Sequence, residues 1–155
     1  MGTMRFNHME LTLPKGSLDE RMRGEIAAFY EDVFGWQPLD VDIVGQRSLL
    51  LRVDEEVSQF VLVAESRKPM QSPGYDHLGL LLETREEVDA VHARCRAWAE
   101  RDDRVGIKEY DDLLQGDVTV HAFYVRYLLP VWFDVQCLEW AEGKAPRRRW
   151  IYGPA

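Results

Sequence analysis

The chain repeats itself once, and this internal repeat constrains its fold more than any other feature. Residues 6–13 (FNHMELTL) recur as residues 75–82 (YDHLGLLL), with the aromatic residue, the Asn or Asp, the histidine and the apolar run in the same order. A helix-like segment and several strand-like segments follow each copy. Because a solenoid needs at least about three repeats for stability, we expect two half-modules that form one pseudo-symmetric domain.

Composition narrows the class of protein. A chain of 155 residues can bury a core without disulfides or a structural metal. Cys95 and Cys137 are far apart and form no CxxC motif, so we expect reduced, buried thiols in a cytoplasmic protein. No apolar run is long enough to span a membrane. The net charge of −8 disfavours nucleic acid as a partner.

The first half of the sequence predicts a strand, a helix and three further strands. Residues 5–13 alternate between apolar and polar side chains, which is typical of a half-buried strand. Residues 18–34 carry an apolar stripe at helical spacing, with Ser17 and Glu20 at the spacing of a capping box and Gly35 at the end. Strands are expected at about 37–44, 47–53 and 58–65.

The second half predicts the same order of elements. Residues 76–82 are typical of a strand, and Thr84 with Glu87 again has the spacing of a capping box before an amphipathic helix. Strands are expected at about 106–110, 117–127 and 133–141. The last strands of the two halves share glutamine, alanine and glutamate at the same offsets, which aligns Gln59 with Gln136. Each half is therefore predicted to be a βαβββ module in an α+β fold.

Paired βαβββ modules that each open with an aromatic-x-His strand resemble the vicinal oxygen chelate superfamily. This group includes glyoxalase I, methylmalonyl-CoA epimerase, extradiol dioxygenases, and fosfomycin- and bleomycin-resistance proteins. Residues 29–36 (FYEDVFGW) are also similar to the family phrase FYxxVLGW. The resemblance implies a cup-shaped mixed sheet with helices outside. We expect one domain over residues 1–155, with module 1 at about 4–66, a linker at 67–74, module 2 at about 75–142 and a basic tail at 143–155.

The resemblance also implies a metal site. Ligands in this family lie on the first and fourth strands of each module, and these places fall on His8, Gln59, His77 and Gln136. Such a set would hold a divalent ion such as Zn, Ni, Mn, Co or Fe. The better-known enzymes have a glutamate where this chain has Gln136, so the four side chains supply no compensating negative charge. The alternative interpretation, a metal-free pocket in which the histidines only form hydrogen bonds, therefore remains.

Glu10 is the candidate catalytic base. It follows His8 by two residues, so it lies on the same strand face and about 7 Å further along. Its counterpart in the second half is Gly79, which breaks the symmetry of the repeat. In this family a divalent ion chelates two adjacent substrate oxygens and stabilises the enolate or oxyanion that forms, while a carboxylate or metal-bound water moves the proton. His92 is expected at the surface, and His121 in a core or hydrogen-bonding role.

Two functions follow from the resemblance. The first is a metal-dependent lyase or isomerase similar to glyoxalase or the epimerase, because His8, Gln59 and His77 partly match the epimerase pattern. Dioxygenase and fosfomycin-resistance activities require a carboxylate that Gln136 does not supply. The second is a metal-free ligand-binding protein like the bleomycin-resistance proteins, since the chain is acidic and rich in aromatic residues after position 120. A regulatory module with an empty cup is a third interpretation.

The expected partners are a small-molecule ligand or substrate and a second copy of the chain. Members of the superfamily often form homodimers, and the apolar strand faces are compatible with one. The basic tail, which contains Lys144, Arg147, Arg148 and Arg149, favours a solvated segment or a subunit contact over a phosphate site. Loops around Gly45, 111–116 and 128–133 are expected to shape the pocket.

Overall fold

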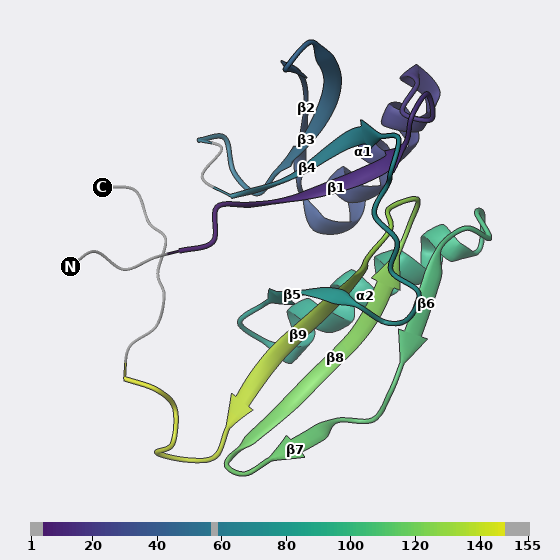
Figure 1. Cartoon of the computed structure of the whole chain (residues 1–155). Helices are drawn as coiled ribbons and strands as arrows, with labels where there is room; N and C mark the ends of the chain where they lie inside the picture. Colours follow the sequence, from purple (N-terminus) through teal and green to yellow (C-terminus); the bar gives the residue numbers. More distant parts are fainter. Residues whose placement is uncertain (1–4, 57–58, 148–155) are drawn as a thin grey trace.

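The structure is a computed structural model that describes residues 5–56 and 59–147 (Figure 1). Its first half contains β1 (His8–Pro14), α1 (Glu20–Phe34), β2 (Gln37–Ile43), β3 (Gln46–Arg52) and β4 (Phe60–Ser66). Its second half contains β5 (His77–Leu81), α2 (Arg85–Ala99), β6 (Gly106–Glu109), β7 (Leu113–Gln115), β8 (Val118–Arg126) and β9 (Trp132–Trp140). The basic tail predicted at 143–155 lies outside the described residues from position 148 onward.

The strands form two mixed sheets, one from each half of the chain. The first sheet has the order β1-β4-β3-β2, and the second has the order β5-β9-β8-β6 with β7 paired to β8. In each sheet the first strand of the module runs parallel to the last strand, and the other pairs are antiparallel. The predicted α+β fold is confirmed. The short strand β7 was not predicted, because residues 111–116 resemble a loop in composition.

The register of the ladders shows how the two modules correspond. His8 lies opposite Phe60, and His77 lies opposite Trp132. The same backbone hydrogen bond precedes both pairs, from Phe60 to the carbonyl of Asn7 and from Trp132 to the carbonyl of Asp76. His8 and His77 are therefore equivalent, as the repeat predicted.

The predicted alignment of the two glutamines is wrong. Trp132 follows Phe60 by 72 positions, whereas Gln136 follows Gln59 by 77, so the sequence alignment slips by five residues. The position equivalent to Gln136 is occupied by Ala64. Short identities in two apolar strands misled the alignment, because backbone pairing and not residue identity sets the register.

Each sheet has one face covered by helices and one face that we call the open face. On the covered faces, apolar side chains from both sheets join those of α1 and α2 in one core; examples are Leu11, Val63, Val125, Phe133 and Val135. The two helices also contact each other. Because strand side chains alternate, the open face of the first sheet carries His8, Glu10, Phe60 and Leu62, and that of the second sheet carries His77, Gly79, Trp132, Asp134 and Gln136.

Aromatic rings connect the modules within the core. The Phe133 ring of β9 lies 5.4 Å from Tyr30, 5.6 Å from Phe34 and 5.6 Å from Trp36, all in the first module. The Tyr30 hydroxyl donates a hydrogen bond of 2.9 Å to the carbonyl of Tyr127. These contacts fix one module against the other through buried and partly buried side chains of the core.

The helix boundaries follow the sequence with one exception. Thr84 and Glu87 form the predicted capping box, and Gly35 ends α1 in the left-handed conformation that favours glycine. The N-cap of α1, however, is Asp19, whose carboxylate accepts a hydrogen bond from Met22 N. The Ser17 prediction is wrong because the Ser17 hydroxyl donates to the carbonyl of Pro14.

Two further predictions concern the whole chain. Cys95 and Cys137 are buried free thiols, and burial raises the pKa of both. Among the described residues, none of the helices has the length and apolar character needed to cross a membrane.

Candidate functional site

His77 is the first side chain of the candidate site. Its Nδ1 lies 2.9 Å from the carbonyl oxygen of Tyr75. Because a carbonyl can only accept, Nδ1 carries a proton, and Nε2 is the ring nitrogen left to contact another group. This Nε2 lies 3.8 Å from Oδ2 of Asp134. The second ring nitrogen of His77 therefore faces a carboxylate on the open face of the second sheet.

Asp134 is a buried carboxylate, only 8% exposed. It lies opposite Gly79 on β5 and Tyr124 on β8, so its side chain points to the open face. Burial raises its pKa, while a hydrogen bond from Tyr110 and the charge of His77 partly lower it. The Tyr110 hydroxyl donates to Oδ1 at 3.2 Å, which leaves Oδ2 on the side of His77.

Aromatic rings form a wall around this pair. The Tyr124 ring lies 4.9 Å from the His77 ring and 5.3 Å from the Tyr110 ring. Tyr75 lies 5.4 Å from Trp132 and 6.2 Å from Tyr124. Such a wall lowers the local polarity and strengthens electrostatic interactions with the carboxylate.

Gln136 lies next to Asp134 on the same open face. Its side-chain nitrogen is 3.2 Å from the point where a Cβ of Gly79 would lie. The missing side chain at Gly79 thus makes room for the Gln136 amide. In the first module, the pair of opposite residues equivalent to Gly79 and Asp134 is Glu10 and Leu62. Each sheet therefore carries one acid in this pair, Glu10 on the first strand of its module and Asp134 on the last strand of the other.

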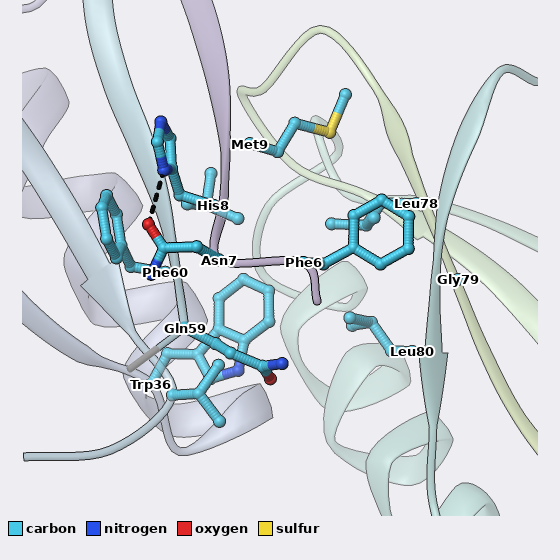
Figure 2. Close-up of a pocket in the computed structure, with 12 residues that line it drawn as sticks. Phe6, Asn7, His8, Met9, Trp36, Gln59, Phe60, Leu78, Gly79 and Leu80 are labelled. Atoms are coloured by element: carbon cyan, nitrogen blue, oxygen red, sulfur yellow. Dashed lines mark hydrogen bonds between the residues drawn. The ribbon is translucent and has the colours of Figure 1, made fainter. Parts of the chain in front are cut away.

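His8 occupies the equivalent place in the first module. Its Nδ1 lies 2.8 Å from Oδ1 of Asn7, and its ring stacks on Phe60 at 4.8 Å. Since the amide oxygen only accepts, Nδ1 again carries a proton, and Nε2 is left to contact another group. In Figure 2 the His8 ring points away from the strand that carries Leu78 and Gly79. No contact joins His8 to His77 within residues 5–56 and 59–147, so one chain places them on separate open faces.

Gln59 lies in a groove between the modules. A pocket of about 440 Å³ there is lined by Gln59, Trp36, Leu78 and Leu80 together with Phe6 and His8 (Figure 2). Gln59 precedes β4 and lines this pocket together with the apolar side chains of Trp36, Leu78 and Leu80. Gly79, which lies opposite Asp134, also lines the groove, whereas His77 and Asp134 are not among its lining residues.

The remaining histidines lie outside the site. His121 points to the covered side of the second sheet, where it contacts carboxylates of Asp112 at 2.7 Å and Asp89 at 2.9 Å. This agrees with its predicted hydrogen-bonding role. His92 on α2 lies 2.8 Å from a carboxylate oxygen of Glu109.

The described part of the chain contains no group of three or more His, Cys, Asp or Glu side chains placed to hold a metal ion. The structure brings His77 and Gln136 to one open face together with Asp134, and it places His8 and Glu10 on the other.

Sequence reasoning missed Asp134, Tyr110 and Tyr124. A signal for Asp134 exists, because it is the one acid within the run VWFDVQCL.

The raised pKa of Asp134 predicts how stability depends on pH. The folded state binds more protons than the unfolded state between the ordinary aspartate pKa of about 3.9 and the raised value. The free energy of unfolding of the wild type therefore falls as pH rises through this window. We expect Asp134→Asn to remove this fall, so the variant gains stability relative to the wild type. Urea unfolding at a series of pH values measures the difference; a difference independent of pH would contradict the assignment.

Comparisons with known proteins agree with the fold. Residues 24–99 match the family model described as Glyoxalase/Bleomycin resistance protein/Dioxygenase superfamily. A mutant of the fosfomycin resistance protein FosX from Listeria monocytogenes, complexed with Mn(II) and 1S,2S-dihydroxypropylphosphonic acid, is 14% identical, with a TM-score of 0.57 over 86% of this chain and 92% of that one.

A second solved structure has a similar degree of likeness. A glyoxalase/bleomycin resistance protein from Albidiferax ferrireducens T118 is 15% identical, with a TM-score of 0.53 over 85% of this chain and 97% of that one. At these identities the likeness shows the fold. Among curated protein sequences, none matches the chain.

Proposed function

We propose that this protein is a lyase or isomerase that acts on a small molecule with the help of a divalent metal ion. Its resemblance to the vicinal oxygen chelate superfamily is confirmed by the family-model match and by the fold. The proposal centres on the open face of the second sheet. There His77 and Asp134 would hold the ion, with Gln136 beside them.

One observation carries this proposal. Nδ1 of His77 is hydrogen-bonded to a backbone carbonyl, which directs Nε2 toward the carboxylate of Asp134. A hydrogen bond of this kind from the second ring nitrogen is typical of metal-binding histidines, because it fixes the tautomer and the ring orientation. A metal ion between Nε2 and Oδ2 would be bound by the lone pair of the neutral imidazole and by the carboxylate.

The residues of one chain fit part of such a centre. The imidazole of His77 and the carboxylate of Asp134 are ligands that suit Zn, Mn, Fe, Co and Ni. Asp134 also supplies the negative charge that a set of two histidines and two glutamines lacks. Two strong ligands are fewer than metal sites ordinarily use, so a further nitrogen is needed.

We expect this nitrogen from His8 of a second copy of the chain. His8 resembles His77, because its Nδ1 is also hydrogen-bonded and its Nε2 is left to bind a ligand, but it lies on the open face of the other sheet. Both open faces expose apolar side chains, among them Leu39, Leu81 and Trp140. A twofold homodimer would cover these surfaces and bring His8 of one copy to His77 of the other. Gln59 lies in the separate groove, where it would act from outside this centre.

The chemistry follows from the charges on the two faces. A bound divalent ion would supply Lewis-acid stabilisation of a negative charge that develops on substrate oxygen. Glu10 lies on the open face with His8 and is exposed, so it remains our candidate for the base that moves a proton. The aromatic wall around Asp134 would limit water at the reacting atoms.

Metal titration tests the proposal. We expect wild-type protein, purified without an affinity tag, to bind Mn²⁺ or Zn²⁺. The Asp134→Asn variant should bind the ion at least about 100-fold more weakly, because mutation of a residue that merely hydrogen-bonds to a metal ligand already lowers metal affinity about 10–100-fold. Isothermal titration calorimetry measures both affinities. Asp117→Asn, which removes an exposed carboxylate just before β8, is the matched control. Equal affinity in the three proteins, or no binding by the wild type, would overturn the proposal.

A second function is favoured by the aromatic wall. Tyr75, Tyr110, Tyr124 and Trp132 surround a buried carboxylate, and this arrangement can bind an organic ligand without metal or catalysis. The metal titration described above also distinguishes the two functions. A protein that binds no metal but is stabilised against heat by aromatic metabolites would be a binding protein.

A further inference from the structure

Two cations lie on the open face of the second sheet, beside the pair formed by His77 and Asp134. Lys108 on β6 lies opposite Tyr124, which in turn lies opposite Asp134. Arg126 is two residues further along β8 than Tyr124, so it shares the open face. Neighbouring rows on one face of a sheet are about 7 Å apart along the strand, which is within the reach of one small molecule.

Aromatic rings hold both cations in place. The Lys108 ammonium lies 3.8 Å from the centroid of the Tyr75 ring, and the Arg126 guanidinium carbon lies 4.6 Å from that of Trp132. The two rings also contact each other. Gly106 makes room for this stack, since a Cβ there would lie 3.0 Å from Trp132 Cη2. The side chains are therefore positioned before any ligand binds, which reduces the entropy lost on binding.

Neither cation is neutralised by a carboxylate. Within the part of the chain that the structure describes, no ion pair joins Lys108 or Arg126 to Asp or Glu, whereas Arg85 pairs with Asp112 and Glu139. Both side chains are only partly exposed. In a protein with a net charge of −8, two adjacent and unpaired cations on a half-buried surface can compensate the charge of an anionic ligand.

We propose that Lys108 and Arg126 bind an oxyanion group of the substrate, namely a carboxylate, phosphate or phosphonate. The inference rests on the proposed function and names its substrate class. A guanidinium presents paired N–H donors that match two oxygens of such a group, and an ammonium adds a point charge. The anionic end of the substrate would lie against Tyr75 and Trp132, and its oxygen-bearing carbons would extend toward His77 and Asp134.

Binding of simple anions to the metal-free protein tests this inference. Methylphosphonate, inorganic phosphate, acetate and, as a cationic comparison, tetramethylammonium are titrated in the presence of EDTA and followed by amide chemical shifts. We expect the anions to shift the amide signals of the open face of the second sheet, and tetramethylammonium to leave them unchanged. Lys108→Met and Arg126→Met should each weaken anion binding about 10-fold or more. Comparison of acetate with methylphosphonate distinguishes the kinds of oxyanion.

Arg101→Met is the matched control. Arg101 also lies on an aromatic ring, 4.2 Å from the centroid of Trp98, but it follows α2, which packs on the covered face of the sheet, and it pairs with Asp32 of α1. Its loss should leave anion binding unchanged. Equal weakening in all three variants, no anion binding at millimolar concentrations, or preferential binding of tetramethylammonium would overturn the inference. Because no metal is present, failure of the metal proposal would leave this result unaffected, and the two can be judged separately.

Discussion

Replacing Phe133 with alanine is expected to lower the free energy of unfolding by about 3–5 kcal/mol. The Phe133 ring is fully buried and contacts Tyr30, Phe34 and Trp36 of the first module from a strand of the second. Its loss removes transfer free energy and leaves a cavity where the modules meet. Urea denaturation monitored by circular dichroism measures the change.

Phe6→Ala is the control for this prediction. The Phe6 side chain is 94% exposed, so its truncation should change the free energy of unfolding by no more than about 0.5 kcal/mol. If Phe133→Ala cost less than about 1 kcal/mol, or no more than Phe6→Ala, the two modules would not share the core described above.

The elements of the fold could be read from the sequence because their signals are local. The repeat of FNHMELTL and YDHLGLLL identified the equivalent strands, and the apolar stripes located both helices. Capping at Thr84 depends on residues three positions apart, which the sequence shows directly. Periodicity and capping act over a few residues, so they survive without knowledge of the tertiary structure.

Non-local contacts explain the errors. Ser17 was predicted as the N-cap of α1, but its hydroxyl donates to the carbonyl of Pro14, and the neighbouring Leu18 N donates to the carboxylate of Glu65, 47 positions away. The sequence gives no sign of this contact, which holds the chain in place just before Asp19 begins the helix. The alignment of Gln59 with Gln136 failed for a related reason, since strand register is set by backbone pairing across the sheet.

The candidate site was located only in part from the sequence. His8 and His77 were identified by the repeat. In both, a hydrogen bond to Nδ1 fixes the orientation of the ring, as is typical of metal-binding histidines. The sequence did not indicate Asp134, because the resemblance to the family points to Gln136, where the family has a glutamate. The structure places Asp134 nearer to His77, and the aromatic wall arises from strands whose alternation alone could not show which face was open.

His77→Ala is expected to abolish binding of divalent metal ions, and His8→Ala is expected to have the same effect. Each substitution removes one nitrogen ligand from a centre that already contains few strong ligands, and the remaining groups lack the affinity to retain the ion. Calorimetric titration with Mn²⁺ or Zn²⁺ measures the loss. His92→Ala removes a histidine from α2 that contacts Glu109 and should leave metal binding intact.

The effect of His8→Ala separates the proposed centre from a simpler one. A site made by His77 and Asp134 of one chain would respond to His77→Ala alone, because His8 has no contact with either residue in the described part of the chain. Loss of binding in both variants would require His8 to reach the same ion. That requirement is met by a second copy of the chain.

A mixing experiment tests the central claim that two copies share each metal centre through His8 and His77. The His8→Ala and His77→Ala proteins are unfolded together, refolded, and titrated with Mn²⁺ beside each variant alone. In a mixed dimer one of the two centres keeps both histidines, so random pairing should restore about one quarter of the wild-type sites. No recovery in the mixture, in a protein that sedimentation shows to be dimeric, would contradict the account.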